Sequence, residues 1–436
     1  MNVKIIVEIN DREGGVVQKI VSGSAIEVEE QVEELKQRIG RIVLEYGFEE
    51  VEQSTQRPKC CGRNMNNRGR RPITVTSLSG EIPVERTRYR CRECGRECTP
   101  GDGAICCGSH RITKALAKRV CQLATLEHYT RLEQLLADQH GVHLGHDEMA
   151  QIVHEVGGTA DCHRKTEAQE WWQCSTDQRV WPCAEFTPQR VYVSCDGIMY
   201  CTNQFEPDPQ NPGTNRLIWQ QMRVGCVYWQ DSREHWHKRV LWGRESAQEF
   251  GVALYQLACR CGYRQARDKI FAADGGDWCW DIHLRYFSDA TGILDWYHVS
   301  EHVWNTAHVL HTDADASKSW AMEALGVMRN SGGTGLVDWL TRQRPNFRCG
   351  KRRSLEELLR FVQPRVWQMD YPRYRAADWQ IGTGMIESTA KQLVGIRLKG
   401  PGMHWTEAGA VAITALRAQD LNERWHTFWN QLVLPA

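Results

Sequence analysis

The chain lacks any apolar run of the roughly 18–20 residues that a membrane-spanning helix needs, so we expect no membrane partner. Its first residues, MNVKIIVEINDREGG, carry acidic side chains where a secretory signal has an apolar stretch. These two absences predict a cytoplasmic protein. Neither sign of charge dominates, since the formal net charge is +0. The overall charge is therefore unlike that of a typical nucleic-acid-binding domain.

Local composition departs from this neutral average. Cysteine is frequent, at 18 residues, and in a reducing compartment clustered cysteines more often bind metal than form disulfides. Basic residues concentrate between residues 57 and 96 and again between 342 and 375. Basic patches on a neutral chain are typical of a multidomain DNA enzyme, and equally of ordinary solvated faces.

With 436 residues the chain is long enough for several domains, and we predict a multidomain α+β/α/β fold. The expected parts are an N-terminal β/α segment (1–54), a zinc-ribbon-like region (55–110), a helical region (111–165), an α/β core (166–310), a mainly helical segment (311–381) and the last part of the core (382–436). The first helix is expected near 26–46, from its apolar spacing.

The zinc-ribbon-like region contains two alternating strands joined at Ser79-Gly80, with a pair of cysteines at each end. This pattern predicts a structural Zn²⁺ site, and its expected ligands are Cys60, Cys61, Cys91 and Cys94. Because adjacent thiolates reach one ion only with strained geometry, one of the first two can be a bystander. An alternative second site, or a substitute ligand, is offered by Cys98, Cys106, Cys107 and His110.

The helical region contains short amphipathic segments separated near Gly141 to Gly145. The pattern is that of a helix-turn-helix, and a plain helical hairpin explains it equally well. The polar stretch HRKTEAQEWWQ (163–173) is expected to be a linker.

From residue 190 the pattern alternates between strands and helices. The expected strands are RVYVSC (190–195), LIWQQMRVGCVYW (217–229), HKRVLWG (237–243), DKIFAAD (268–274) and GILDWYHV (292–299), and the expected helices are 246–262 and 278–289.

Two of these strands end in Asp-Gly, at Asp196 and Asp274, and Glu387 begins a late helix that Thr383 is expected to cap. Three converging carboxylates would raise one another's pKa, whereas bound Mg²⁺ or Mn²⁺ would keep them ionised. Two such ions support phosphodiester chemistry. Asp277 competes with Asp274, although helix capping explains it. Glu387 alone is also explained by the helix dipole and by an i,i+4 pair with Lys391.

Four segments, CDG (195–197), ADGGDWCW (273–280), ILDWYHVSEHVW (293–304) and GTGMIESTAKQLVGIRLKGPGMHW (382–405), resemble the DDE transposases of bacterial insertion sequences. The resemblance is to the Mutator-like branch, close to the Kra-type lineage. It includes the ribbon motif RYRCRECG and extends over nearly the whole chain from about residue 55.

This resemblance implies a ribonuclease H-like core with a helical insertion before the catalytic Glu. Asp196, Asp274 and Glu387 would form the triad that binds two Mg²⁺ or Mn²⁺ ions. Asp295 and His298 match an Asp/Cys-x-x-His element of the branch, although the residues alone favour a core role for this histidine.

The expected activity is therefore DNA transposition, with metal-dependent strand cleavage followed by strand transfer. The expected partners are double-stranded DNA, at the transposon ends and target, and further copies of the chain in a dimer or larger assembly at the nucleoid. Expected phosphate contacts are Arg68, Arg70, Arg71, Arg86, Arg88, Arg90 and Lys391. The alternatives are a structure-specific nuclease of the same fold and a non-catalytic DNA-binding regulator.

Overall fold

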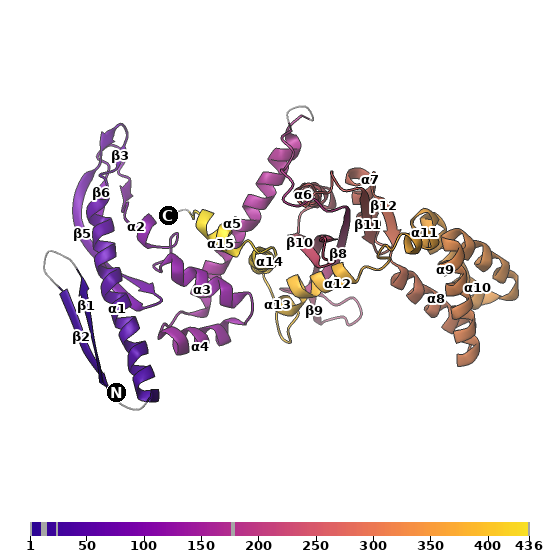
Figure 1. The fold of residues 1–436 in the computed structure, drawn as a ribbon, viewed down its shortest axis with the longest axis horizontal. Coiled ribbons are helices and arrows are strands. Elements are labelled where there is room, and N and C mark those ends of the chain that lie inside the picture. Colours follow the sequence, from indigo (N-terminus) through magenta and orange to yellow (C-terminus); the bar gives the residue numbers. More distant parts are fainter. Residues whose placement is uncertain (1, 10–14, 23–24, 176–178, 435–436) are drawn as a thin grey trace. The chain divides into compact units, whose positions relative to one another are not determined.

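The computed structural model describes residues 2–9, 15–22, 25–175 and 179–434. They form two compact units, one made of residues before Ala160 together with those from Trp425, and the other spanning Ala160–Arg424. Both units contain helices and strands (Figure 1), so the predicted mixture of α and β structure is confirmed. In the described part of the chain no helix is both long and apolar enough to cross a membrane.

The first unit begins with the antiparallel strands β1 (Asn2–Ile9) and β2 (Gly15–Ser22), followed by α1 (Ala25–Ser54). These elements are the β and α structure expected in this segment, but the helix continues beyond residue 46. It continues because Phe48 and Val51 pack against the apolar face of the neighbouring sheet.

That sheet consists of β5 (Asn66–Ser77), β6 (Gly80–Arg90) and β7 (Glu97–Cys98), all antiparallel. A short pair, β3 (Lys59–Cys60) and β4 (Arg63–Asn64), precedes it. Alternate residues of β5 and β6 are buried against α1 and α2 (Asp102–Ile105), and these are Ile73, Val75, Ile82 and Val84. The predicted hairpin is thus confirmed. The arginines of β6 follow Ile82 and Val84 at every second position and so lie on the same face, where Arg86 pairs with Asp102 of α2.

Three helices follow: α3 (Lys114–Ala124), α4 (Tyr129–His140) and α5 (His146–Gln173). Gly141 ends α4 in the left-handed conformation, with φ 62°. The expected linker at 163–173 is wrong, because α5 continues through it. The short helix α15 (Trp425–Gln431) also belongs to the first unit, where the Lys114 ammonium donates to the Leu432 carbonyl at 3.0 Å.

The second unit contains a five-stranded sheet of order β10-β9-β8-β11-β12. Its strands are β8 (Arg190–Pro207), β9 (Asn215–Gln230), β10 (Trp236–Gly243), β11 (Asp268–Ala273) and β12 (Thr291–Leu294). The first three in chain order pair antiparallel, whereas β8, β11 and β12 run parallel.

Two predicted strands need correction. The strand expected at 190–195 does not end at Asp196, because β8 continues to Pro207 and pairs with β9 along this length. The run 292–299 was expected to be extended throughout, but β12 ends at Leu294 and α8 (Trp296–Leu310) begins at once. The change occurs because Asp295 caps the helix, its carboxylate accepting the Tyr297 amide at 2.8 Å.

Helices cover both faces of the sheet. An added Cβ on Gly225 of β9 would lie 2.8 Å from Leu254 of α6 (Ala247–Arg260). The next residue, Cys226, has its sulfur 3.7 Å from the Thr389 hydroxyl of α12 (Gly384–Ala390). Since successive strand residues face opposite sides, α6 and α12 cover opposite faces.

The second unit has further helices before and after the helical segment that lies between β12 and α12. They are α7 (Asp277–Tyr286) after β11, and the π-helix η3 (Lys391–Gly395), α13 (Ile396–Leu398) and α14 (Glu407–Leu421) after α12.

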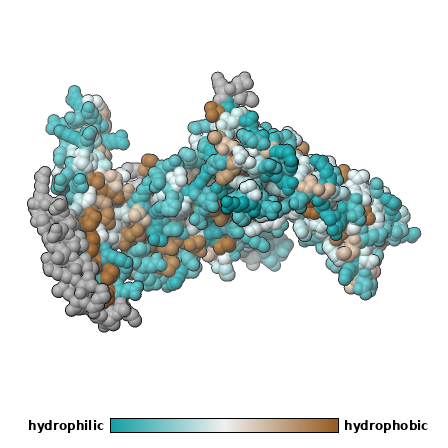
Figure 2. Space-filling model, in the orientation of Figure 1, coloured by the Kyte–Doolittle hydropathy of each residue, from teal (hydrophilic) through white to brown (hydrophobic). Residues whose placement is uncertain are grey.

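A helical insertion separates β12 from α12, as predicted, and its helices lie beside β12 in Figure 1. Besides α8 it contains α9 (Ala314–Gln343), η1 (Arg344–Asn346), α10 (Cys349–Val362), η2 (Gln363–Gln368) and α11 (Tyr371–Ala376). Helix α9 is kinked at Gly332, whose φ of 64° and ψ of −162° only glycine adopts readily. The surface of the helical insertion is mostly hydrophilic on the face drawn in Figure 2.

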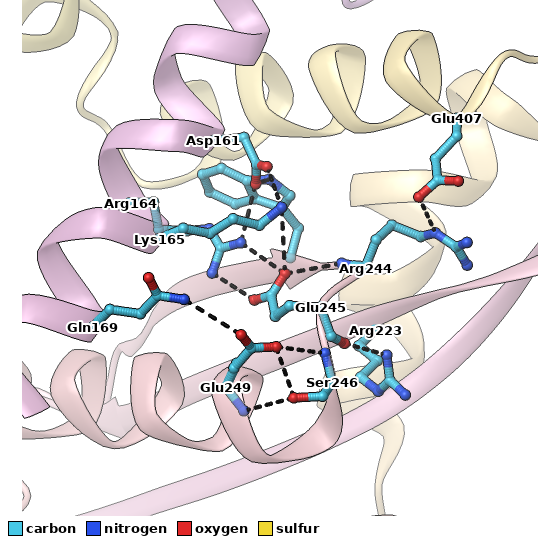
Figure 3. Close-up of polar contacts among 11 residues, drawn as sticks. Asp161, Arg164, Lys165, Gln169, Arg223, Arg244, Glu245, Ser246, Glu249 and Glu407 are labelled. Carbon is cyan, nitrogen blue, oxygen red and sulfur yellow. Dashed lines mark hydrogen bonds and ion pairs between the residues drawn. The ribbon is translucent and has the colours of Figure 1, made fainter.

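The end of α5 is fixed to the sheet by a buried ionic network (Figure 3). The Arg164 guanidinium donates to both Glu245 oxygens, at 2.8 and 3.0 Å, and to Asp161 at 3.0 Å. Trp242 of β10 donates its indole N–H to the same Asp161 carboxylate at 3.0 Å. Removing one member of such a buried network typically costs about 3–5 kcal/mol, because a charge is left unpaired. This anchoring explains why the polar stretch is helical.

Candidate active site and metal centre

Two aspartates lie at one edge of the second unit's sheet. Strands β8 and β11 pair in parallel up to Ser194 and Ala272, so Asp196 and Asp274, just beyond, reach the same edge. The Gly197 amide donates to the Asp196 carboxylate at 2.6 Å, and the Gly276 amide donates to Asp274 at 3.0 Å. Asp274 is therefore oriented by the turn that follows it, whereas Asp196 lies within β8 and is oriented by the next amide of that strand.

Glu387 lies at the same edge of the sheet, on α12, which follows the helical insertion. The chain returns beside the start of α8, where the Trp296 amide donates to the Ile381 carbonyl at 2.9 Å. Glu387 then follows in the first turn of α12, and its Oε1 lies 3.1 Å from the Thr383 hydroxyl. Thr383 was expected to cap this helix, but its side chain makes no capping bond and contacts carboxylates instead.

A cleft of about 310 Å³ joins these groups. It is lined by Cys195, Asp196, Asp274, Asp295, Tyr297, His298, Glu301, Thr383, Ile386 and Glu387. The structure thus brings together the three predicted triad carboxylates and the predicted auxiliary pair. Asp277 is not among the lining residues: its carboxylate is 93% exposed and pairs with Arg365 at 3.1 Å.

The cleft carries uncompensated negative charge. Burial, together with the charges of Asp274 and Glu387, raises the pKa of Asp196 to about 6, although the Gly197 amide opposes the shift. Burial also raises the pKa of Asp295, against hydrogen bonds from Thr383 and the Tyr297 amide. A divalent cation bound among these oxygens would remove the repulsion, so the donor set fits Mg²⁺ or Mn²⁺, which prefer carboxylate ligands.

The helical insertion contacts the turn that holds Asp274. The Phe361 ring of α10 stacks on His302 with centroids 4.2 Å apart and meets His298 edgewise at 5.9 Å. Arg365 donates to the Gly275 carbonyl at 3.1 Å. A Cβ on Gly275 would lie 2.7 Å from Phe361, so glycine is needed here for this ring's approach.

Sequence reasoning missed Glu301, Tyr297 and the contact role of Thr383. A signal for Glu301 was present, since it follows His298 by three residues on α8 and such residues share a helix face. No ion pair joins Glu387 to Lys391 within the described ranges, and Lys391 is exposed outside the cleft lining.

The first unit contains the predicted cysteine cluster. The ligand atoms of Cys60, Cys61, Cys91 and Cys94 all lie within 4.8 Å of one another. Cys60 Sγ is 3.9 Å from that of Cys61 and 3.5 Å from that of Cys94. Ligands at about 2.3 Å from a tetrahedral Zn²⁺ are about 3.8 Å apart, so this group fits zinc.

Local backbone geometry explains how adjacent cysteines both face the cluster. Cys61 and Gly62 form the turn between β3 and β4 with φ of 49° and 74°, and two left-handed residues make a tight hairpin turn. On the other side, the Cys94 and Glu93 amides lower the pKa of the Cys91 thiol to about 7. This favours the thiolate that binds metal.

Among the described residues, the four cysteines above are the one group of three or more Cys, His, Asp or Glu whose ligand atoms all lie within 4.8 Å of one another. The alternative second cluster is therefore not assembled, and the cleft carboxylates share a cleft without lying that close together. The Cys98 thiol lies 3.5 Å from the Met65 sulfur, and the His110 ring pairs with Glu155 at 2.7 Å.

The predicted DNA-contacting arginines fall into two groups. Arg68, Arg70 and Arg71 are exposed on β5. In contrast, the β6 arginines pair within the unit: Arg86 with Asp102 at 2.5 Å, Arg88 with Glu97 at 2.8 Å, and Arg90 with Glu97 at 3.9 Å. The β5 group therefore directs its charge more freely toward solvent.

Comparison with known proteins shows no family for this chain, because no protein-family model and no curated protein matches it. Among solved structures it is similar to one titled "Drosophila P element transposase strand transfer complex", with a TM-score of 0.24 and 8% sequence identity. The match covers 74% of this chain and 81% of that chain. A likeness of this size carries no argument, so any function must be inferred from the chain's own residues.

Proposed function

We propose that the protein is a DDE-type DNA transposase whose catalytic carboxylates are Asp196, Asp274 and Glu387. One observation carries the proposal: these carboxylates come from β8, from the end of β11 and from α12, yet they line one cleft. Burial and the two other acids raise the pKa of Asp196 to about 6. A protein has little reason to maintain such repulsion unless a cation relieves it.

The second unit, in this proposal, is a ribonuclease H-like core. The mixed sheet supports it, with two acids at one edge and a helical insertion at 311–381 that precedes the third acid. The core would comprise 166–310 and the part of 382–436 that precedes α15.

Bound at the three carboxylates, two Mg²⁺ or Mn²⁺ ions would supply Lewis acidity to the attacking and leaving oxygens of a phosphodiester. The residues themselves hold the acids in place: the Gly197 and Gly276 amides orient the aspartates, and Thr383 orients Glu387. Without cations the anionic lining repels a DNA phosphate.

The proposed reaction has two steps, a hydrolysis followed by a transesterification. Water attacks the phosphodiester at the transposon end, and the P–O3′ bond breaks to leave a free 3′-hydroxyl. That hydroxyl then attacks a phosphodiester of the target DNA, whose own 3′ oxygen leaves. Because the second nucleophile is supplied by DNA, no serine or tyrosine nucleophile is needed.

End binding would be the role of the first unit. A Zn²⁺ held by the four cysteines would fix the base of the ribbon, while the exposed arginines of β5 contact phosphates. Lys391 of η3 would contact DNA nearer the cleft. Two ends must be held together, so the active form would be a dimer or larger assembly at the nucleoid.

The test compares Glu387→Gln with Asp277→Asn, which changes an acid outside the cleft. The Gln variant should bind DNA ends normally but lose cleavage by roughly 10²-fold or more, whereas the Asn variant should cleave with Mg²⁺ as the wild type does. Cleavage by Glu387→Gln at the wild-type rate would refute the proposed triad.

The alternatives are separated by the products. A structure-specific nuclease of the same fold would cut but never join a pre-cleaved 3′ end to a second duplex. A DNA-binding regulator would show no metal-dependent cleavage at all.

A further inference from the structure

Thr383 occupies a position between two carboxylates. Its hydroxyl oxygen lies 2.5 Å from Oδ2 of Asp295 and 3.1 Å from Oε1 of Glu387. Thr383 is 4% exposed and Asp295 is 3% exposed, so this hydroxyl is shielded from bulk water. A hydroxyl has a single proton to donate, so Asp295 and Glu387 share this proton and both carboxylates are drawn toward the same point.

We propose that Thr383 is a positioning residue, which transmits the fixed position of Asp295 to Glu387 and so sets the metal affinity of the cleft. This inference rests on the proposed function only in taking the cleft as a cation site. It assigns to Asp295 a role that acts through Thr383 and not through contact with DNA.

Glu387 needs such a support more than the two aspartates do. Asp196 and Asp274 have short side chains, held by the next amide of β8 and by an amide of the turn after β11 respectively. Glu387 is an exposed residue with three rotatable side-chain bonds, and fixing a long side chain costs up to about 2 kcal/mol in conformational entropy. Repulsion from the two aspartates also favours rotamers that point away from the cleft.

Asp295 is suited to be the fixed end of this arrangement. Its amide donates to the Ala273 carbonyl at 2.9 Å, one residue before Asp274. Its carboxylate accepts the Tyr297 amide at 2.8 Å, which leaves Oδ2 for Thr383. Asp295 thereby connects the strand end that carries Asp274 with the helix that carries Glu387.

This connection also solves a problem of chain topology. Glu387 follows the excursion through α9, α10 and α11, so its place is not set by neighbours in sequence. The backbone bond from Trp296 to Ile381 and the side-chain contact from Asp295 to Thr383 both lie where the chain returns. Partners that orient metal ligands in this way typically change metal affinity or activity 10- to 100-fold when removed.

The test uses Thr383→Val, which keeps the shape and loses the hydroxyl, and Thr383→Ser, which keeps the hydroxyl. Thr389→Val is the matched control on the same helix, because its hydroxyl donates to the Met385 carbonyl at 2.7 Å and faces the sheet. Mn²⁺ binding is measured directly by electron paramagnetic resonance without DNA, beside the Mg²⁺ dependence of cleavage.

The valine variant at 383 should bind Mn²⁺ roughly 10- to 100-fold more weakly, while the serine variant and the control retain wild-type affinity. Equal affinity of Thr383→Val and wild type, or failure of serine to restore binding, would overturn the positioning role. A wild-type protein that binds no Mn²⁺ would overturn it too. If Mn²⁺ binding follows the expected order but no variant cleaves DNA, the proposed function fails and the positioning role stands.

Discussion

Replacing Asp196 with Asn should stabilise the second unit at neutral pH when no divalent cation is bound to the cleft. The fold raises the pKa of this carboxyl from 3.8 to about 6, so ionising it costs free energy in the folded protein. At about 1.4 kcal/mol per pKa unit, a shift of roughly two units corresponds to about 3 kcal/mol. Asn has nearly the same shape and never ionises, so the variant avoids this cost.

The effect has a defined pH window. Because the folded protein binds the Asp196 proton more tightly than the unfolded chain, its free energy of unfolding falls as pH rises from about 4 to about 6. Above this window the loss is complete. The curves for wild type and Asp196→Asn should therefore coincide below pH 4 and differ by about 3 kcal/mol above pH 6.

The assay is urea denaturation in buffer stripped of divalent cations, repeated across this pH range. Added Mg²⁺ identifies the transition of the second unit, since it should stabilise wild type far more than the variant. Asp281→Asn, which changes an exposed acid on α7, serves as the control and should show no such window. A less stable Asp196→Asn protein at pH 7.5, or parallel pH curves, would refute the argument from burial and repulsion.

Other predictions concern zinc, backbone strain and DNA binding. Cys91→Ser should abolish zinc in elemental analysis and lower the melting temperature, whereas Cys162→Ser, at an exposed position, should keep both. Gly332→Ala should destabilise the protein by roughly 1–3 kcal/mol in thermal unfolding, because the backbone at this position is strained for alanine and the new Cβ would lie 2.7 Å from the Met369 carbonyl oxygen. Gly326→Ala, which has open space around the new Cβ, should instead stabilise it by about 0.5–1 kcal/mol. Removing the exposed arginines of β5 should lower the slope of log affinity against log salt by roughly 2–3, with cleavage unchanged at saturating DNA. The triple variant is Arg68→Ala, Arg70→Ala and Arg71→Ala.

Periodicity and turn residues were sufficient to predict most of the elements and the edge where the two aspartates meet. The Asp-Gly pairs after two predicted strands marked both aspartates, although only β11 ends there and β8 continues through Asp196 to Pro207. The stretch after Leu294 was predicted to be a strand and is a helix instead. Its apolar residues resemble a strand, whereas the hydrogen bond that the Tyr297 amide donates to the Asp295 carboxylate favours the helix.

The rest of the cleft depends on contacts between distant segments. Thr383 looks like a helix cap in the sequence, because nothing local indicates that Asp295 lies beside it. The stacking of Phe361 on His302 could not be predicted either, because the two residues come from different helices of the insertion. The adjacent cysteines are a partial exception, since Gly62 hinted at the left-handed turn that lets Cys60 and Cys61 face one cluster.

The division of the chain has a consequence for how the protein is made. The first unit includes α15, with Trp425 and Trp429 buried, although the segment 160–424 separates that helix from the rest. At roughly 5–20 residues per second, a ribosome needs on the order of tens of seconds to synthesise that segment. The second unit is therefore free to fold during translation, while the first lacks α15 until the residues after 424 have been synthesised. The first unit would then complete its core only after the second unit has folded.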